Sequence, residues 1–173
     1  MAAKSTATAE KAETANTKKI DLNKLNLDEK VTVKNLAGWR VTFARLHDGV
    51  GDIVIEMNGQ QRLSRNEVQA QINGGNKLFC GVDGQGSHAT LFIEDEATRM
   101  LVGFEDEDRK QVVFSDTTVK ELFTLKDAEF EKQLPQRIVT RAEKYALVEA
   151  IKRLELNDYR KIVFAANYTG YKI

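Results

Sequence analysis

The stretch that decides the fold is Gly74-Gly75-Asn76-Lys77-Leu78-Phe79-Cys80-Gly81-Val82-Asp83-Gly84-Gln85-Gly86-Ser87-His88. Five of its fifteen residues are glycine. Glycine takes positive φ without a steric penalty and lets another backbone approach closely. This density indicates either a set of tight turns or a surface that another main chain approaches. Because apolar runs flank the glycines, we expect a loop between two strands, Lys77 to Cys80 and His88 to Glu94.

Upstream of the glycine stretch, apolar and polar residues alternate, which is typical of half-buried strands. The run that begins at Trp39 places Trp39, Val41 and Phe43 on one face, which we expect to be the core side. Asn58-Gly59 is the strongest two-residue signal for a β-hairpin and predicts a tight turn there. The strands that we expect lie within residues 31–46 and at 53–57, 61–63, 77–80, 88–94 and 111–114.

Helical signals fall between the strands and, above all, after them. Ser64-Arg65-Asn66-Glu67 fits a capping box and predicts one short helix, which Gly74-Gly75 ends. A second capping box, Thr140-Arg141-Ala142-Glu143, opens a longer helix. Pro135, the only proline, is expected to close the helix before it. The further helices are expected at 95–101, 117–126, 127–134, 141–156 and 158–167.

These elements predict an α+β fold. Residues 31–115 are expected to form a small, mostly antiparallel β-barrel or sandwich with one inserted short helix, and we prefer the barrel. Residues 116–173 are expected to form a helical region packed on or beside it. Residues 1–19 hold no large apolar side chain after Met1, so we expect 1–30 to be a flexible arm and linker. Such an arm either solubilises the protein or orders on a neighbouring subunit.

Composition excludes several classes of function. The chain has 26 basic and 26 acidic side chains, so no net charge draws it toward nucleic acid or an anionic membrane. With Cys80 as the only cysteine and two histidines, we expect no disulfide, no four-ligand zinc site and no cofactor. No apolar run approaches the roughly 18–20 residues that cross a bilayer. We therefore expect a protein that is made and kept in a cytoplasm, or packaged from one, and that has no membrane partner.

The glycine stretch supplies the candidate interaction loop, which consists of Gly81, Asp83, Gly84, Gln85, Gly86, Ser87 and His88. Asp83, Ser87 and His88 have the residue types of a catalytic triad. Neighbouring residues of a strand point to opposite faces, however, and the Gly-x-Ser-x-Gly elbow is absent. The glycine spacing also matches neither the dinucleotide fingerprint nor the P-loop. We expect turns between strands, open to close contact with another chain.

Three other groups of residues remain as weaker candidates. The acidic runs at 94–96 and 105–108 lack the spacing of a calcium loop and are expected to be solvated. His47 with Asp48 has no third metal ligand nearby. A candidate basic face for nucleic acid consists of Arg40, Arg45, Arg62 and Arg65. We favour a charged outer face of a half-buried sheet over nucleic-acid binding, because alternation places the neighbouring aromatic residues on the core side.

Five short runs occur together in this chain: Asn35-Leu36 with Trp39, Arg62-Leu63-Ser64-Arg65-Asn66-Glu67-Val68, Gly75-Asn76-Lys77-Leu78-Phe79, Asp83-Gly84-Gln85-Gly86-Ser87-His88-Ala89 and Tyr168-Thr169-Gly170-Tyr171. As a set they resemble small virion-associated proteins of tailed bacteriophages, mostly of Gram-positive hosts. The resemblance covers about Val31 to the C-terminus and carries over no catalytic residue. It implies a non-enzymatic structural protein of the virion, on the capsid or at the head–tail connection, that binds other virion subunits or itself. The alternative is an intracellular phage module that acts on nucleic acid or on a host protein.

Overall fold

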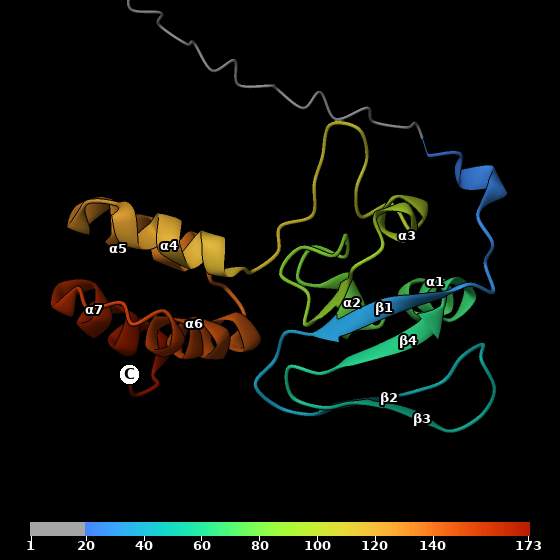
Figure 1. Ribbon diagram of the computed structural model, residues 1–173, viewed down its shortest axis with the longest axis horizontal. Coiled ribbons are helices and arrows are strands. Elements are labelled where there is room, and N and C mark those ends of the chain that lie inside the picture. The colour runs from blue at the N-terminus through green and yellow to red at the C-terminus, as the bar shows by residue number, and fades with distance from the viewer. Residues whose placement is uncertain (1–19) are drawn as a thin grey trace, which may run out of the picture.

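The computed structural model describes residues 20–173, which form five strands, seven α-helices and one 3-10 helix (Figure 1). The first nineteen residues of the expected N-terminal arm lie outside the described residues. The strands are β1 (Lys30–Asn35), β2 (Val41–Ala44), β3 (Asp52–Ile55), β4 (Gln60–Ser64) and β5 (Leu91–Ile93). The helices are η1 (Leu22–Lys24), α1 (Arg65–Asn73), α2 (Lys77–Cys80), α3 (Glu96–Leu101), α4 (Asp116–Thr124), α5 (Asp127–Arg137), α6 (Arg141–Arg153) and α7 (Tyr159–Thr169).

The strands form two small antiparallel sheets. The first has the order β4-β1-β5, and the second is the β2-β3 hairpin. The register sets Val31 opposite Leu63 and Val33 opposite Ile93, so one face of the first sheet is apolar. The predicted α+β fold is confirmed, but the strands of residues 20–173 do not close into a barrel.

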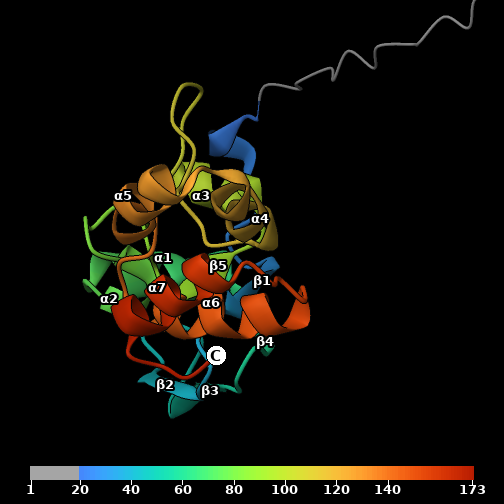
Figure 2. The same ribbon diagram turned by 90° about the vertical axis from the view of Figure 1, so that its left-hand side faces the viewer.

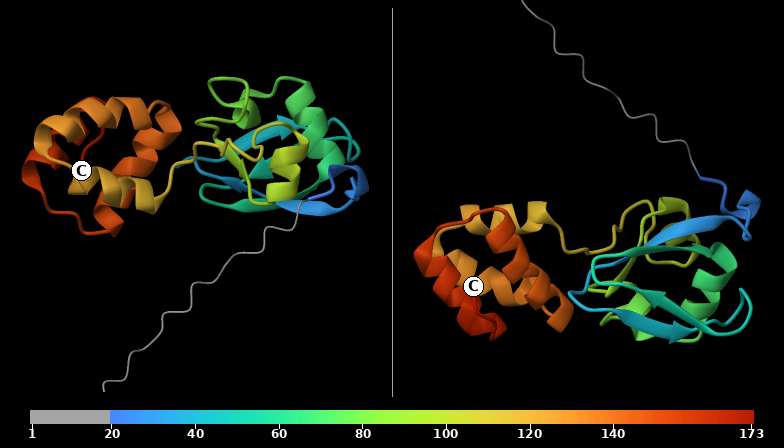
Figure 3. Two further views of the ribbon diagram at one scale, coloured as in Figure 1. Left: turned by 90° about the horizontal axis from the view of Figure 1, so that it is seen from above. Right: turned by 60° about the horizontal axis from the view of Figure 1, so that its bottom comes forward.

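The described residues hold two separate hydrophobic cores, and Figures 1 and 3 show the two bodies side by side. The core of the β lobe, which we define as residues 20–105, collects side chains from all five strands, α1 and α2. The core of the helical lobe, residues 116–173, comes from α4 to α7. In Figure 2, which looks at the helical lobe end-on, α6 and α7 lie in front of the sheets.

The Asn58-Gly59 turn does not close a hairpin, contrary to the prediction. It lies between β3 and β4, which belong to different sheets, and the hairpin is β2-β3. The reason is Asn35, whose fully buried side chain donates to the Trp39 oxygen at 2.8 Å and the Glu56 oxygen at 3.0 Å. These bonds hold the end of β3 beside the end of β1 and direct the chain into the other sheet.

The segment Lys77–Cys80 is the helical turn α2 and not the predicted strand. Asn76 caps it, because its side chain accepts the Leu78 N–H at 3.0 Å. The turn buries Phe79 and Cys80 together. Two adjacent buried residues fit a helical turn, whereas a strand would send them to opposite faces.

Two further predicted strands are wrong in extent or in kind. The strand expected from His88 begins only at Leu91, because His88 has φ +57°, outside the range of a strand. The run 111–114 forms no strand among the described residues. Its one backbone contact with the glycine loop is the Val112 oxygen, which accepts the His88 N–H at 3.3 Å.

Pro135 lies inside α5, which continues to Arg137, so the predicted helix end is wrong. A proline removes one backbone donor and hinders the preceding turn. Only two residues of α5 follow Pro135, and the Ile138 N–H bonds to the Leu134 oxygen at 2.9 Å. Burial of Ile138 in the core therefore extends the helix past the proline.

Candidate functional site

The glycine loop is a closed turn system whose two ends are hydrogen-bonded to each other. The Val82 N–H donates to the Ser87 oxygen at 3.0 Å, and the Gly86 N–H donates to the Cys80 oxygen at 2.8 Å. Gly81 has φ +66°, and a Cβ there would lie 2.0 Å from the Ser87 oxygen. Only glycine fits at this crossing, as the density of glycine in the sequence indicated.

Asp83 holds the middle of the loop. Its Oδ1 accepts the N–H of Gln85 at 2.8 Å and the N–H of Ser87 at 3.1 Å. Burial tends to raise the pKa of Asp83, but the hydrogen bonds from Ser87 and Gln85 outweigh it and hold that pKa below its usual value. The Asp83 carboxylate therefore stabilises the conformation of the loop.

The base of the loop is packed against Phe104 of the β lobe and against Gln111 in the segment that follows it. A Cβ on buried Gly86 would lie 2.6 Å from the Phe104 ring, and the Gly86 oxygen accepts Gln111 Nε2 at 2.6 Å. Gly84, at the tip, also has positive φ (+76°), but a Cβ there would meet nothing within 4 Å. The loop therefore has a fixed base and an open tip.

His88, at the end of the loop, contacts the helical lobe. Its Nδ1 lies 2.6 Å from Oε1 of Glu143, and the two side chains are only 13% and 5% exposed. The other Glu143 oxygen completes the predicted capping box of α6 by accepting the Thr140 N–H at 3.0 Å. Because His88 pairs with Glu143, the histidine is not placed as a base for Ser87.

A small cavity of about 360 Å³ lies beside this pair, between the loop and the start of α6. Its walls come from both lobes: Lys77, Gly81, Val82, His88, Thr90 and Thr140. A larger cleft of about 580 Å³ lies between the first sheet and α6, with Lys34, Phe92, Phe114, Tyr145 and Glu149 among its walls. Both hollows mix charged, polar and apolar groups.

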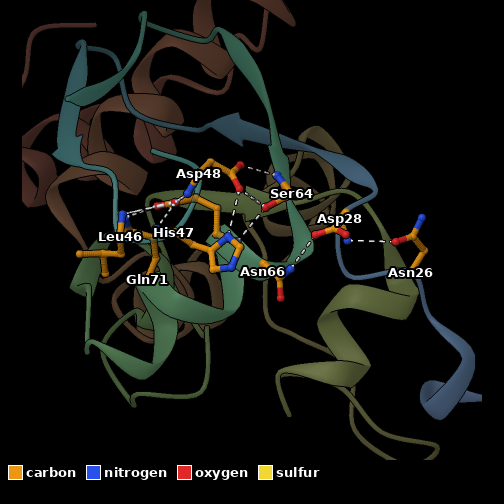
Figure 4. Close-up of polar contacts among 9 residues, drawn as sticks. Asn26, Asp28, Leu46, His47, Asp48, Ser64, Asn66 and Gln71 are labelled. Carbon is orange, nitrogen blue, oxygen red and sulfur yellow. Dashed lines mark hydrogen bonds and ion pairs between the residues drawn. The ribbon is translucent and has the colours of Figure 1, made fainter. Parts of the chain in front are cut away.

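A second cluster of serine, aspartate and histidine stands at the start of α1 (Figure 4). Ser64 Oγ donates to Asp48 Oδ1 at 2.5 Å and accepts the Glu67 N–H at 3.0 Å as the helix cap. His47 Nδ1 lies 3.4 Å from the same Asp48 oxygen. The carboxylate thus stands between the hydroxyl and the imidazole, so His47 cannot take the serine proton as in a Ser-His-Asp triad.

The predicted capping box of α1 is only half formed: the Ser64 side chain accepts the Glu67 N–H, but the Glu67 side chain does not accept the Ser64 N–H. The fully buried carboxylate of Glu67 accepts the backbone N–H groups of Leu46 at 3.0 Å and of His47 and Asp48 at 2.7 Å. Burial tends to raise the pKa of Glu67, but these bonds and one from Gln71 hold it below its usual value. Glu67 therefore fixes the loop of the β2-β3 hairpin, and Asp48 accepts the Ser64 N–H in its place at 3.1 Å.

Arg65 is buried, 4% exposed, so it cannot belong to an exposed basic face. Its guanidinium pairs with Glu29 at 2.5 Å and with Asp95 at 3.2 Å, and it donates to the Asn26 oxygen at 2.8 Å. Arg65 thereby ties the described end of the N-terminal segment to α1 and α3. Of the other predicted members, Arg40 is exposed in the loop before β2, Arg62 is exposed on β4, and Arg45 is half-buried.

The acidic runs have cationic partners within the chain. Asp95 caps α3, and Glu96 pairs with Lys110 at 2.5 Å. Glu105 is buried, contrary to the prediction of a solvated run, and lies 3.1 Å from Arg99. Within residues 20–173 no group of three or more histidine, cysteine, aspartate or glutamate side chains is arranged to hold a metal ion.

No protein-family model, curated protein or solved structure matches this chain. In the described part of the chain, no helix combines the length and the apolar character needed to cross a membrane.

The glycine loop was predictable from its composition, but the contact of His88 with Glu143 was not. Glu143 is 55 residues away, and no local pattern joins the two. Alternation also placed Trp39 on the core side, yet Trp39 is 37% exposed and packs on Tyr145 of α6. Trp39 precedes β2, so the alternation of the strand does not govern it.

Proposed function

We propose that this protein is a non-enzymatic structural protein of a tailed bacteriophage particle, located on the capsid or at the head–tail connection. It binds neighbouring virion subunits, including copies of itself, through the glycine loop and the N-terminal arm. It resides in the host cytoplasm during assembly and in the virion afterwards. The phage context rests on the sequence resemblance, and the mode of binding rests on the loop. For the β lobe we infer an open sandwich, because both sheets contribute to one core.

The observation that carries the proposal is an exposed loop whose shape is fixed by its own hydrogen bonds. Asp83 binds the backbone of Gln85 and Ser87, while Val82 is 59% exposed. A loop with a fixed shape loses little conformational entropy when a partner binds. The open space around Gly84 lets a foreign main chain approach.

The arrangement of the reactive side chains favours binding over catalysis. Ser64 caps α1 and donates its hydroxyl proton in a hydrogen bond to Asp48, and His88 pairs with buried Glu143. A nucleophile and a base need a hydrogen bond between them, with the base oriented by a third group. These side chains instead serve the packing of loops and helices.

The described root of the N-terminal arm supports its role as a tether. Besides Arg65, Asn66 binds it twice, through its N–H to the Leu27 oxygen at 2.9 Å and through its side chain to Asp28 at 2.9 Å. Residues 26–29 are therefore attached to α1 at several points. The arm therefore has a fixed point of attachment on the β lobe, as a tether to a neighbouring subunit requires.

The test is incorporation into particles. Phage that carries Val82→Glu should assemble particles from which this protein is missing or strongly depleted, as measured by mass spectrometry of purified virions. Val50→Glu is the matched control, since Val50 is 98% exposed at the tip of the β2-β3 hairpin and outside the glycine loop. Absence of the unaltered protein from mature virions, or normal incorporation of Val82→Glu, would overturn the proposal.

A further inference from the structure

Aromatic rings from both lobes meet on one surface at the junction. The exposed Trp39 ring packs edge-on against Tyr145 of α6, with ring centroids 6.3 Å apart. Tyr145 in turn packs against Tyr171, near the C-terminus, at 5.8 Å. We call this surface, with the cations described next, the junction strip. Its members are Trp39, Arg141, Lys144, Tyr145, Tyr168 and Tyr171.

Two cations of the junction strip lie over these rings. The Arg141 guanidinium is 5.4 Å from the centroid of Trp39, and its Nε donates to the Tyr171 hydroxyl at 3.3 Å. The Lys144 ammonium is 4.2 Å from the centroid of Tyr168. Arg141, Lys144 and Tyr145 stand at i, i+3 and i+4 of α6, so they share one face of the helix.

These cations have no carboxylate partner within residues 20–173. Elsewhere in the helical lobe, Arg153 pairs with Asp116, and Arg160 lies 3.4 Å from Asp127. The carboxylate nearest to Arg141 in sequence is Glu143, which is buried against His88. No carboxylate of residues 20–173 therefore neutralises the positive charge of the strip, which suits an anionic ligand.

The strip is held in place by close packing. A Cβ on Gly38 would lie 1.8 Å from the Tyr145 ring, so glycine is required for this approach of the two lobes. Rings and cations fixed in this way need little reorganisation when a ligand binds.

We propose that the junction strip binds single-stranded nucleic acid. The exposed ring of Trp39 offers a stacking surface for an unpaired base, with the half-buried tyrosine rings beside it. The cations bind the phosphates, which is how sequence-tolerant single-strand binders work. A duplex fits less well, because its base faces are already stacked on one another. This inference concerns a surface and a ligand that are separate from the loop contacts of the proposed function.

Trp39 is the only tryptophan, so the fluorescence of the full chain reports directly on the strip. Titration with a twelve-nucleotide oligothymidylate at low salt should quench this fluorescence to saturation. Added salt should weaken the binding, because phosphate contacts release counterions. Arg141→Ala should weaken it by about tenfold, because it removes the cation that lies over Trp39 and binds a phosphate. Arg160→Ala, an exposed arginine on α7, is the matched control and should leave binding unchanged.

Heparin separates stacking from charge alone, because it is anionic and has no bases. The proposal expects weak heparin binding without quenching. Equal quenching by heparin, no oligonucleotide binding at low salt, or unchanged binding by Arg141→Ala would each overturn it. A further outcome would assign the strip to protein docking instead. In that case the protein would bind a virion protein but no oligonucleotide, and Arg141→Ala would abolish the protein binding. Trp39→Phe keeps a ring and the fold, and it should retain binding measured by anisotropy of a labelled oligonucleotide.

Discussion

The two lobes are stabilised by different kinds of interaction. Of the nine buried polar or charged residues in the described part of the chain, seven lie in the β lobe: Asn35, Ser64, Arg65, Glu67, Gln71, Thr98 and Glu105. The helical lobe contributes only Glu143 and Lys161. Helices satisfy their own backbone groups, so four of them can meet through apolar side chains. Five short strands leave long loops, and buried polar side chains hold those loops in place.

The largest effect is expected from the apolar core of the helical lobe. Phe130 is fully buried and packs edge-on against Phe123 at 5.3 Å and Phe164 at 6.1 Å. Phe130→Ala should lower the free energy of unfolding by about 4 kcal/mol, from lost burial and the cavity left behind. Urea unfolding followed by circular dichroism measures the loss. Glu131→Ala, exposed on the same helix, should change it by less than about 0.5 kcal/mol.

The same variant tests whether the lobes are separate units of stability. Hydrogen exchange of Phe130→Ala should show lost protection in α4 to α7 and retained protection in β1. Equal loss in both lobes would mean that they unfold together. The two lobes would then differ in the interactions that pack them but not in their stability as units.

A somewhat smaller effect is expected from the polar contacts of the β lobe. Glu67→Gln places an amide NH₂ near the three N–H groups that the carboxylate accepts, which removes charge-assisted hydrogen bonds at a buried site. The free energy of unfolding should fall by about 3 kcal/mol. Tryptophan fluorescence in urea would measure it, and Glu56→Gln, at an exposed residue, is the control. A change under about 1 kcal/mol would mean that the loop holds its shape without this residue.

The smallest effect is expected from mild acid, and it should fall first on the β lobe. Hydrogen bonds hold the pKa values of Asp48, Glu67 and Asp95 below their usual values, against the opposing effect of burial. A lowered pKa in the folded state stabilises the fold above the unfolded value, 4.5 for Glu67, and this contribution is lost as the pH falls through the folded value. In the helical lobe, hydrogen bonds from Lys161 lower the pKa of Asp158, which lies at the surface and not in the core.

Hydrogen exchange at stepped pH values below 4.5 would test this order. The loop at residues 46–50 and the described N-terminal segment should lose protection before α6 does. Earlier loss in α6 would contradict the assignment of these carboxylates as the main acid-sensitive contacts.

The helical lobe was also the easier one to predict from sequence, for a physical reason. Helix ends depend on residues within one turn, so Thr140 and Gly170 mark them locally. Strand pairing depends on distant residues. Asn58-Gly59 carries a strong hairpin signal, but Asn35, more than twenty residues earlier, decides where the chain goes next.

The candidate site was predictable only where glycine itself was the signal. The crossing at Gly81 follows from composition, because few other residues allow it. The pair of His88 with Glu143 and the contact of Trp39 with Tyr145 join residues from different lobes. Arg65 was predicted to be a surface cation, because its partners Glu29 and Asp95 lie far from it in the sequence.

The single cysteine provides a chemical probe for opening of the β lobe. Cys80 is buried at the end of α2, and that burial raises the pKa of its thiol. A thiol reagent can reach it only while the surrounding structure is open, so the labelling rate counts opening events. The labelling rate of Cys80 in assembling particles can be compared with the rate in solution. A lower rate in particles would mean that binding to a neighbouring subunit reduces the opening of the β lobe, and an equal rate would mean that it does not.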